Sequence, residues 1–360
     1  MKKYYLENMP QVNESMERVE SWYQGEKTDR APIRFSEHNA RHNVDLSQVL
    51  AGYDTVKDFW FDTEYQVNSF IENLEGSTVY GDTFPVFFPN LGPSVFASYY
   101  GVPLSYADVT SWALHTVSDL SALDISSLKI DRECENWKKI DELTDYALAR
   151  CKDKFFVGYT DLHPSMDCAV DFTGVDEMCM SLIDDPDKVK EFLNKLCDDF
   201  FPVYDYYYQR LEGMPSVSWM GIPFEGKMHI PSCDFSAMLS PAMFEEFVLP
   251  CVVKEAKAFD HNIFHMDGPG VMRHLDMLLD VNEIRAIQLV QGVGDDEPIM
   301  QWLPVIKKIQ ARGKGVVIGL QKHELKDFMA NMDPKGIFLT LAADEKEQPE
   351  IVKLVEEWCK

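Results

Sequence analysis

Residues 263–292, IFHMDGPGVMRHLDMLLDVNEIRAIQLVQG, contain one strand, one helix and a second strand in a single stretch. The apolar run at 262–266 leads to His265 and Asp267, and a glycine-proline turn follows. Residues 269–279 have the apolar spacing of an amphipathic helix, and residues 284–290 are a second apolar run that ends in glutamines. A strand–helix–strand unit of this kind predicts parallel strands joined by a right-handed crossover.

The same alternation extends in both directions along the chain. We expect strands at 31–36, 154–161, 216–221, 262–266, 284–290, 315–319 and 337–342, and a short segment at 230–235. We expect helices at 139–151, 174–183, 186–212, 241–258, 269–279, 299–312, 322–331 and 346–358. The number of strands approaches eight, and the last ones are apolar on both faces, as a closed barrel requires. The sequence therefore predicts an α/β fold, a (β/α)8 TIM barrel with elaborated N-terminal loops and helices.

One domain over residues 1–360 accounts for this pattern, with an N-terminal extension and loops over roughly 1–130 and regular βα units over roughly 139–360. Residues 45–125 look irregular, and long irregular segments commonly decorate an active-site face. Ser240 and Pro241 predict a helix start, with serine as the N-cap and proline in the first turn, where its missing N–H costs nothing.

Composition limits the classes of function. The chain has 360 residues, 46% of them hydrophobic, and a formal net charge of −26. This acidity opposes binding to nucleic acid or to anionic membranes. No apolar run is long enough to span a bilayer, and the polar N-terminus lacks the apolar segment of a secretory signal. The eight cysteines are scattered without a CxxC pair, which is typical of reduced thiols in a cytoplasmic protein.

His265 and Asp267 are the strongest candidates for chemistry. Because side chains alternate along a strand, both point to the same side at its C-terminal end, where barrel enzymes keep their active sites. Imidazole and carboxylate both suit zinc, so the pair is a candidate half of a metal site. The pair equally suits acid–base work, and His265 could instead serve only to hold the following turn.

Other candidates follow the earlier strands. Cys233 could bind a metal as a thiolate or be a small buried residue, and Asp234 could be a site carboxylate or a helix cap. Glu225 is the preferred third metal ligand beside His265. Further candidates for substrate binding follow the ends of several strands: Glu37, His38, Asp161, His163, Gln288, Gln291 and Trp219.

Several familiar signatures are absent from the sequence. It contains no GKS/T phosphate loop, no GxGxxG dinucleotide motif, no HExxH and no GxSxG. Nucleotide hydrolysis, dinucleotide redox chemistry and serine hydrolysis are therefore disfavoured.

The motifs FHMDGPG–RHLD–LL–AIQLVQG and SCDFSAMLSPAMFEEFVLP resemble the uroporphyrinogen decarboxylase superfamily, most closely its corrinoid- and cobamide-dependent methyltransferase branch. The resemblance is clearest over residues 219–319 and extends more faintly to FPNLGP at 88–93 and DDPDKV at 184–189. It implies a TIM barrel, in agreement with the strand count.

The sequence departs from two patterns of that superfamily. The N-terminal arginine-rich motif of the decarboxylases is missing, although Arg34 and Arg41 occupy the region. Methyltransferases that act on thiols use a His-x-Cys pair and a later cysteine, whereas this chain has His265 and Asp267 and no cysteine in LTLAADEKE. The resemblance thus implies a harder nitrogen and oxygen site, suited to a methyl ether or a methylamine.

We therefore expect a methyltransferase component that demethylates an O- or N-methylated small molecule and passes the methyl group to the cobalt of a separate corrinoid protein. Zinc held by His265 and Glu225 is the expected metal, and Asp234 or Asp267 the group that manages the leaving-group proton. Two alternatives stay open, a cofactor-free decarboxylase (a carboxy-lyase) and a non-catalytic partner that binds a corrinoid protein or a ligand. The oligomeric state is also open, with a homodimer among the alternatives.

Overall fold

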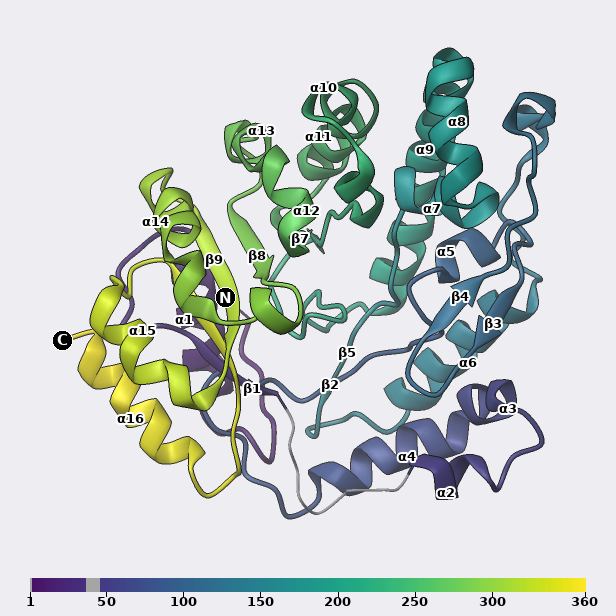
Figure 1. The fold of residues 1–360 in the computed structure, drawn as a ribbon. Helices are drawn as coiled ribbons and strands as arrows, with labels where there is room; N and C mark the ends of the chain where they lie inside the picture. Colours follow the sequence, from purple (N-terminus) through teal and green to yellow (C-terminus); the bar gives the residue numbers. More distant parts are fainter. Residues whose placement is uncertain (1, 37–45) are drawn as a thin grey trace.

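The computed structural model describes residues 2–36 and 46–360. Within them, one curved parallel sheet has the strand order β1–β10–β9–β8–β7–β6 (Figure 1). In chain order its strands are β1 (Ile33–Ser36), β6 (Met228–His229), β7 (His261–Asp267), β8 (Ala286–Val290), β9 (Gly315–Leu320) and β10 (Ile337–Ala342). The expected strands at 262–266, 284–290, 315–319 and 337–342 are confirmed, and each lies next to its neighbour in sequence, as right-handed crossovers require.

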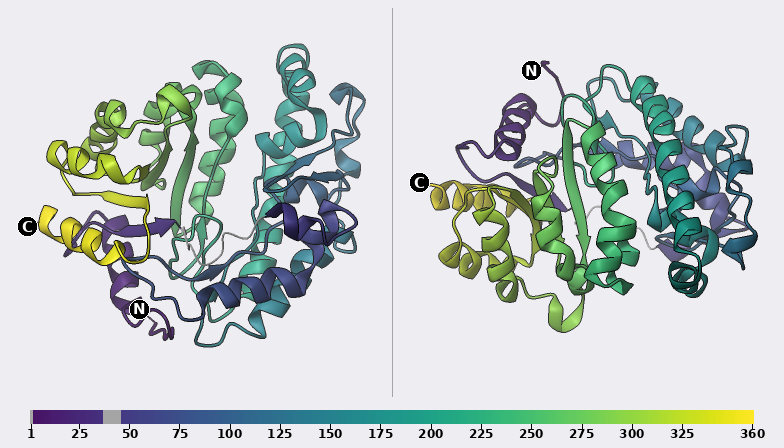
Figure 2. Two further views of the ribbon diagram at one scale, coloured as in Figure 1. Left: turned by 60° about the horizontal axis from the view of Figure 1, so that its bottom comes forward. Right: turned by 90° about the horizontal axis from the view of Figure 1, so that it is seen from above.

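Helices connect these strands and cover the outer side of the sheet (Figures 1 and 2). The main ones are α11 (Leu249–Ala258), α13 (Leu275–Asp280), α14 (Leu303–Ala311), α15 (Leu325–Asn331) and α16 (Gln348–Trp358). Shorter turns of helix precede them: η4 (Asp234–Met238), α10 (Pro241–Met243), η5 (Phe244–Val248), α12 (Gly268–Val271), η6 (Met272–His274), η7 (Gly294–Asp296), η8 (Ile299–Trp302) and η9 (Lys322–Glu324). Ser240 caps α10 as expected, since its side chain accepts from the Met243 N–H.

The first helix, α1 (Val12–Tyr23), packs against the six-stranded sheet, where Trp22 Nε1 donates to the Gly336 carbonyl and the Tyr23 hydroxyl accepts from the Asn262 N–H. Residues 46–210 build a separate, mostly helical side of the molecule (Figure 1). Its helices and 3-10 turns are α2 (Leu46–Leu50), α3 (Val56–Phe61), α4 (Thr63–Leu74), α5 (Val95–Ser98), η2 (Leu120–Ala122), η3 (Ile125–Ser127), α6 (Glu135–Leu148), α7 (Met166–Thr173), α8 (Val175–Asp184) and α9 (Pro186–Arg210). A short parallel pair, β2 (Val86–Phe87) and β5 (Phe156–Val157), and a hairpin, β3 (Leu104–Tyr106) and β4 (Ser111–Ala113), complete it.

The arrangement is a TIM-like half-barrel, and the prediction of a closed eight-stranded barrel is wrong in that respect. No backbone ladder joins β1 to β2 or β5 to β6 in the described part of the chain. At the first break, the Asp82 N–H bonds to the Ile33 carbonyl at 2.6 Å, and two side chains add to this link: Asp82 accepts from the Ile33 N–H at 2.9 Å, and Thr83 accepts from the Phe35 N–H at 2.8 Å. At the second, the Tyr159 N–H bonds to the carbonyl of Val217 at 3.0 Å.

A local reversal of the chain causes the second break. Because of this reversal, the predicted strand at 216–221 does not form. Ser216 pairs with Phe224 in an antiparallel bridge, so the chain turns back at residues 219–221 instead of continuing. Gly221 has φ +67°, a backbone conformation that favours glycine and that this turn requires. The predicted strand at 154–161 shrinks to β5, which pairs with β2, and on its other side the Tyr159 N–H makes one backbone hydrogen bond, to the carbonyl of Val217.

Two further expectations need correction. Residues 45–125 are more regular than their sequence suggests, since they include the twelve-residue helix α4. The predicted helix 241–258 is divided by the π-helical turn η5. The buried side chains form one hydrophobic core that runs from Leu6 to Val355.

The two faces of the sheet differ in polarity. In β7, Phe264 and Met266 are fully buried towards the covering helices, whereas His265 and Asp267 retain solvent exposure. His265 is in register with Gln288 in β8 and forms a parallel bridge with Ser232. Because paired residues of parallel strands point to the same side, these polar residues form a row on the inner face.

Among the described residues, no helix is both long and apolar enough to cross a bilayer. All eight cysteines carry free thiols.

Candidate active site

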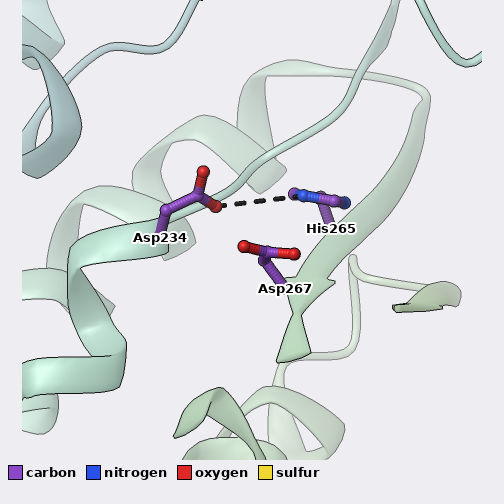
Figure 3. A group of neighbouring side chains, drawn as sticks. All are labelled: Asp234, His265 and Asp267. Atoms are coloured by element: carbon purple, nitrogen blue, oxygen red, sulfur yellow. Dashed lines mark ion pairs between the residues drawn. The ribbon is translucent and has the colours of Figure 1, made fainter. Parts of the chain in front are cut away.

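His265, Asp267 and Asp234 come together at the C-terminal end of β7 (Figure 3). The first two follow from strand alternation, and Asp234 is brought in by η4, which begins at that residue. One nitrogen or carboxylate oxygen from each residue lies within 4.8 Å of the other two, and His265 Nε2 lies 3.9 Å from Asp234 Oδ1. Two elements distant in sequence thus supply three potential metal ligands.

The His265 ring has a defined orientation and tautomer. Its Nδ1 lies 2.6 Å from Gln288 Oε1, and because a carbonyl oxygen only accepts, Nδ1 carries the proton. In the neutral ring, Nε2 is then the nitrogen without a proton, and it faces Asp234. The Trp219 ring packs edge-on against the imidazole, with centroids 5.2 Å apart. A histidine held through one nitrogen, with the lone pair of the other facing carboxylates, has the geometry of a metal ligand.

Asp234 is positioned by its neighbours. The Asp167 carboxylate accepts from the N–H groups of Asp234 and Phe235 at 3.1 and 3.2 Å, and so caps η4. On the other side, α12 lies very close to η4 at Gly270. A Cβ atom added to Gly270 would be only 2.7 Å from the Ala237 Cβ, so this approach requires glycine. The Asp234 side chain is 58% exposed, but partial desolvation by the surrounding site and then the Asp167 carboxylate raise its pKa to about 6.

A second polar chain adjoins this group. Asp161 Oδ1 lies 2.8 Å from His163 Nε2, and His163 Nδ1 lies 2.6 Å from Ser232 Oγ. The His163 and Asp161 side chains are only 11% and 14% exposed. Burial by itself would lower the pKa of His163, but the Asp161 carboxylate, with weaker effects of Asp167 and Asp234, outweighs it and raises that pKa to about 10. His163 is therefore an imidazolium at neutral pH.

This charge makes stability depend on pH. An unfolded histidine loses its proton near its ordinary value of 6.5, so the stabilisation from His163 is fully present below pH 6.5 and is lost as pH rises through about 10. Between pH 6.5 and about 10, the free energy of unfolding of the wild type should decrease. We expect this decrease to be larger than that of His163→Gln by on the order of 3 kcal/mol. Urea unfolding with a chelator present measures it, and parallel pH curves for the two proteins would contradict the assignment.

The structure places the remaining predicted residues differently. Glu225 precedes β6, whose Met228 pairs with His261 at the start of β7. At about 3.3 Å per residue, His265 lies about 13 Å further along that strand. Glu225 accepts from the backbone N–H of Lys2 instead, so the structure does not bring it to His265.

The other predicted positions lie at or near the site with different roles. Cys233 is 2% exposed, and burial raises the pKa of its thiol well above the usual value, which opposes metal binding as a thiolate. Gln291 donates to the carbonyl of Gly319, and Gln288 is engaged with His265. Glu37 and His38 lie outside the described residues.

Sequence reasoning missed Ser232 and the capping role of Asp167. Ser232 had a usable signal, because it lies two residues before Asp234 in an extended segment that leads into the site. For Asp167 no local signal exists, since its contacts are with residues more than 60 positions away.

Comparison with known proteins identifies the fold. The chain matches no protein-family profile and no curated protein by sequence. Among solved structures it is similar to a methyltransferase from Methanosarcina mazei, with a TM-score of 0.62 and 11% sequence identity. The similarity covers 96% of this chain and 99% of that one. At such identity it establishes a shared overall fold along the whole length of both chains.

Proposed function

We propose that this protein is a methyltransferase component that moves a methyl group from an O- or N-methylated small molecule to the cobalt of a corrinoid protein. The observation that carries the proposal is the group of Asp234, His265 and Asp267 on a fold shared with a methyltransferase. The motif resemblance to corrinoid-dependent methyltransferases supports the corrinoid as acceptor.

The residues of this group fit a divalent metal, with zinc as our proposal. With Nδ1 held by Gln288, the neutral imidazole presents the lone pair of Nε2 towards the two carboxylates, which is the form that metal binding requires. One nitrogen and two carboxylate oxygens form a hard site, which suits an oxygen- or nitrogen-bound methyl group better than a thiol. When bound, a divalent metal supplies Lewis-acid polarisation of the heteroatom that carries the methyl group.

The protein's own residues account for the remaining requirements. Gln288 fixes the His265 ring, and Asp167 fixes Asp234, so the group is organised before any ligand arrives. The Trp219 ring provides an apolar surface next to His265 for the body of the substrate. Free thiols throughout the chain support our proposal of a cytoplasmic location.

Decarboxylation is less well supported. A cofactor-free decarboxylase acting on an acidic substrate needs basic groups that converge on it, whereas the residues gathered here are mainly carboxylates. Asp161, Asp167, Asp234 and Asp267 all belong to the group or adjoin it.

Methyl transfer to free cob(I)alamin tests the proposal directly. The purified protein is supplied with zinc, and methyl ethers and methylamines are screened for conversion of the cob(I)alamin spectrum to that of methylcobalamin. We expect at least one donor class to react in a protein- and zinc-dependent manner. Failure of every donor, also with corrinoid proteins as acceptors, would contradict the proposal.

A further inference from the structure

The inner face of the sheet continues beyond the metal group, across β9, β10 and β1. In these strands, buried residues alternate with residues that keep partial exposure, among them Gly319, Thr340 and Arg34. Thr340 is in register with Gly319 on one side and with Arg34 on the other. Because paired residues of parallel strands point to the same side, the three lie next to one another on the inner face.

This row is continuous with the proposed metal group. Leu289 is in register with Ile318, so the residues that follow them, Val290 and Gly319, are neighbours on the inner face. Val290 is in turn paired with Asp267 of the metal group. Apart from its two neighbours in the chain, no described residue has an atom within 4 Å of the place that a Cβ on Gly319 would take. The sheet therefore leaves space for part of a bound molecule at Gly319.

Arg34 brings a positive charge to this face. Its guanidinium lies against the reversal of the chain at residues 219–221, since a Cβ on Gly221 would be only 3.1 Å from Arg34 Nη1. Trp219, two residues before Gly221, packs against the His265 ring. Two residues of chain span at most about 7 Å, so the guanidinium and the imidazole are held at the two ends of a short turn.

A guanidinium next to a hydroxyl group is suited to binding a carboxylate. Arginine donates two parallel N–H groups to the two carboxylate oxygens, and its five N–H groups allow it to hold a ligand in addition to a protein partner. The hydroxyl of Thr340 can donate a further hydrogen bond. One positive charge near several carboxylates matches a ligand with one negative charge better than a ligand with two.

We propose that Arg34 and Thr340 bind a carboxylate group of the methyl donor, and that Gly319 leaves room for the part of the donor between this carboxylate and the metal group. This inference rests on the proposed function and narrows its substrate class to small carboxylic acids that carry an O- or N-methyl group. Because Asp234 and Asp267 repel an anion, the donor binds with its methylated end towards the metal group and its carboxylate towards Arg34.

Binding of two matched ligands to the zinc-supplied protein tests this inference without methyl transfer. The probes are para-methoxybenzoate and para-methoxybenzamide, which have the same shape, although only the first is charged. By calorimetry, we expect the wild type to bind the benzoate about 10- to 100-fold more tightly, because the amide lacks the charge-assisted pair with Arg34. Arg34→Gln should remove this preference, and Arg34→Lys should retain part of it, since lysine keeps the charge but loses the planar fork.

Two further variants complete the experiment. Valine has nearly the shape of threonine, so Thr340→Val should fold normally and weaken only the binding of the benzoate, by about 3- to 10-fold. This variant tests the site even if Arg34→Gln does not fold. Arg312 is an exposed arginine that pairs with Asp280, so Arg312→Gln is the matched control and should bind both ligands as the wild type does.

The carboxylate site and the proposed function fail in different ways. Wild type that does not bind the benzoate, or that binds both ligands equally, would overturn the carboxylate site even if another donor transfers its methyl group. A preference for the benzoate that survives in both Arg34→Gln and Thr340→Val would also overturn it. Binding of the benzoate that depends on Arg34, without methyl transfer from any donor, would support the carboxylate site and contradict the proposed function.

Discussion

Replacing His265 by alanine is expected to weaken zinc binding at least about 100-fold and to reduce methyl transfer by a similar factor or more. The imidazole supplies the single nitrogen ligand of the proposed site and lies opposite Asp234, next to Asp267. Its Nδ1 contact with Gln288 is what aims Nε2 at Asp234. Zinc titration by isothermal calorimetry and the metal content of the purified variant measure the effect.

Two other substitutions make this experiment decisive. His323 is an exposed histidine in η9 that does not belong to the group of Asp234, His265 and Asp267, so His323→Ala is a matched control that should bind zinc as the wild type does. The sequence predicted Glu225 as a zinc ligand, whereas the structure places it at the other end of the strands. Glu225→Gln should therefore change the zinc affinity by less than about 2-fold. Zinc loss in Glu225→Gln with retention in His265→Ala would refute the proposed ligand set.

Asp82→Ala is expected to cost about 3–5 kcal/mol of folding free energy, the largest effect on stability that we predict. The Asp82 side chain has no solvent exposure and accepts from Arg18 Nη1 and Arg30 Nη1, each at 2.6 Å. It also accepts from the Ile33 N–H at the open edge of β1. Removing the carboxylate leaves two buried guanidinium groups without their shared partner and breaks the link that joins α1 and β1 to the segment before β2.

Asp29→Ala is the matched control for this prediction. Asp29 also pairs with the Arg18 guanidinium, at 2.6 Å, but its side chain is 67% exposed. Exposed pairs contribute about 0–1 kcal/mol, so this variant should lose little stability. Urea unfolding at pH 7 should show a much lower midpoint for Asp82→Ala with an unchanged slope. Similar midpoints for the two variants would contradict the prediction, because the buried Arg18–Asp82 contact would then stabilise the fold no more than the exposed Arg18–Asp29 contact.

The sequence by itself determined the fold class and one half of the site. Apolar runs buried on both faces, separated by amphipathic helices, are sufficient to predict parallel strands with helical crossovers, and β7, β8, β9 and β10 lie where that pattern puts them. The placement of His265 and Asp267 on the same side of β7 required only the two-residue period of a strand. These features are local, so they can be read from a single sequence.

The tertiary structure alone decided which residues complete the site. Asp234 joins His265 because α12 packs closely against η4 at Gly270, and Ser232 joins His163 through contacts 69 residues apart. The reversal of the chain at residues 219–221 opens the barrel and places Glu225 at the far end of the strands. Strand periodicity predicts which face of the sheet a side chain occupies. Which side chains meet depends on the strand register and on close packing between distant segments, and a single sequence carries no local signal for the register or for the packing.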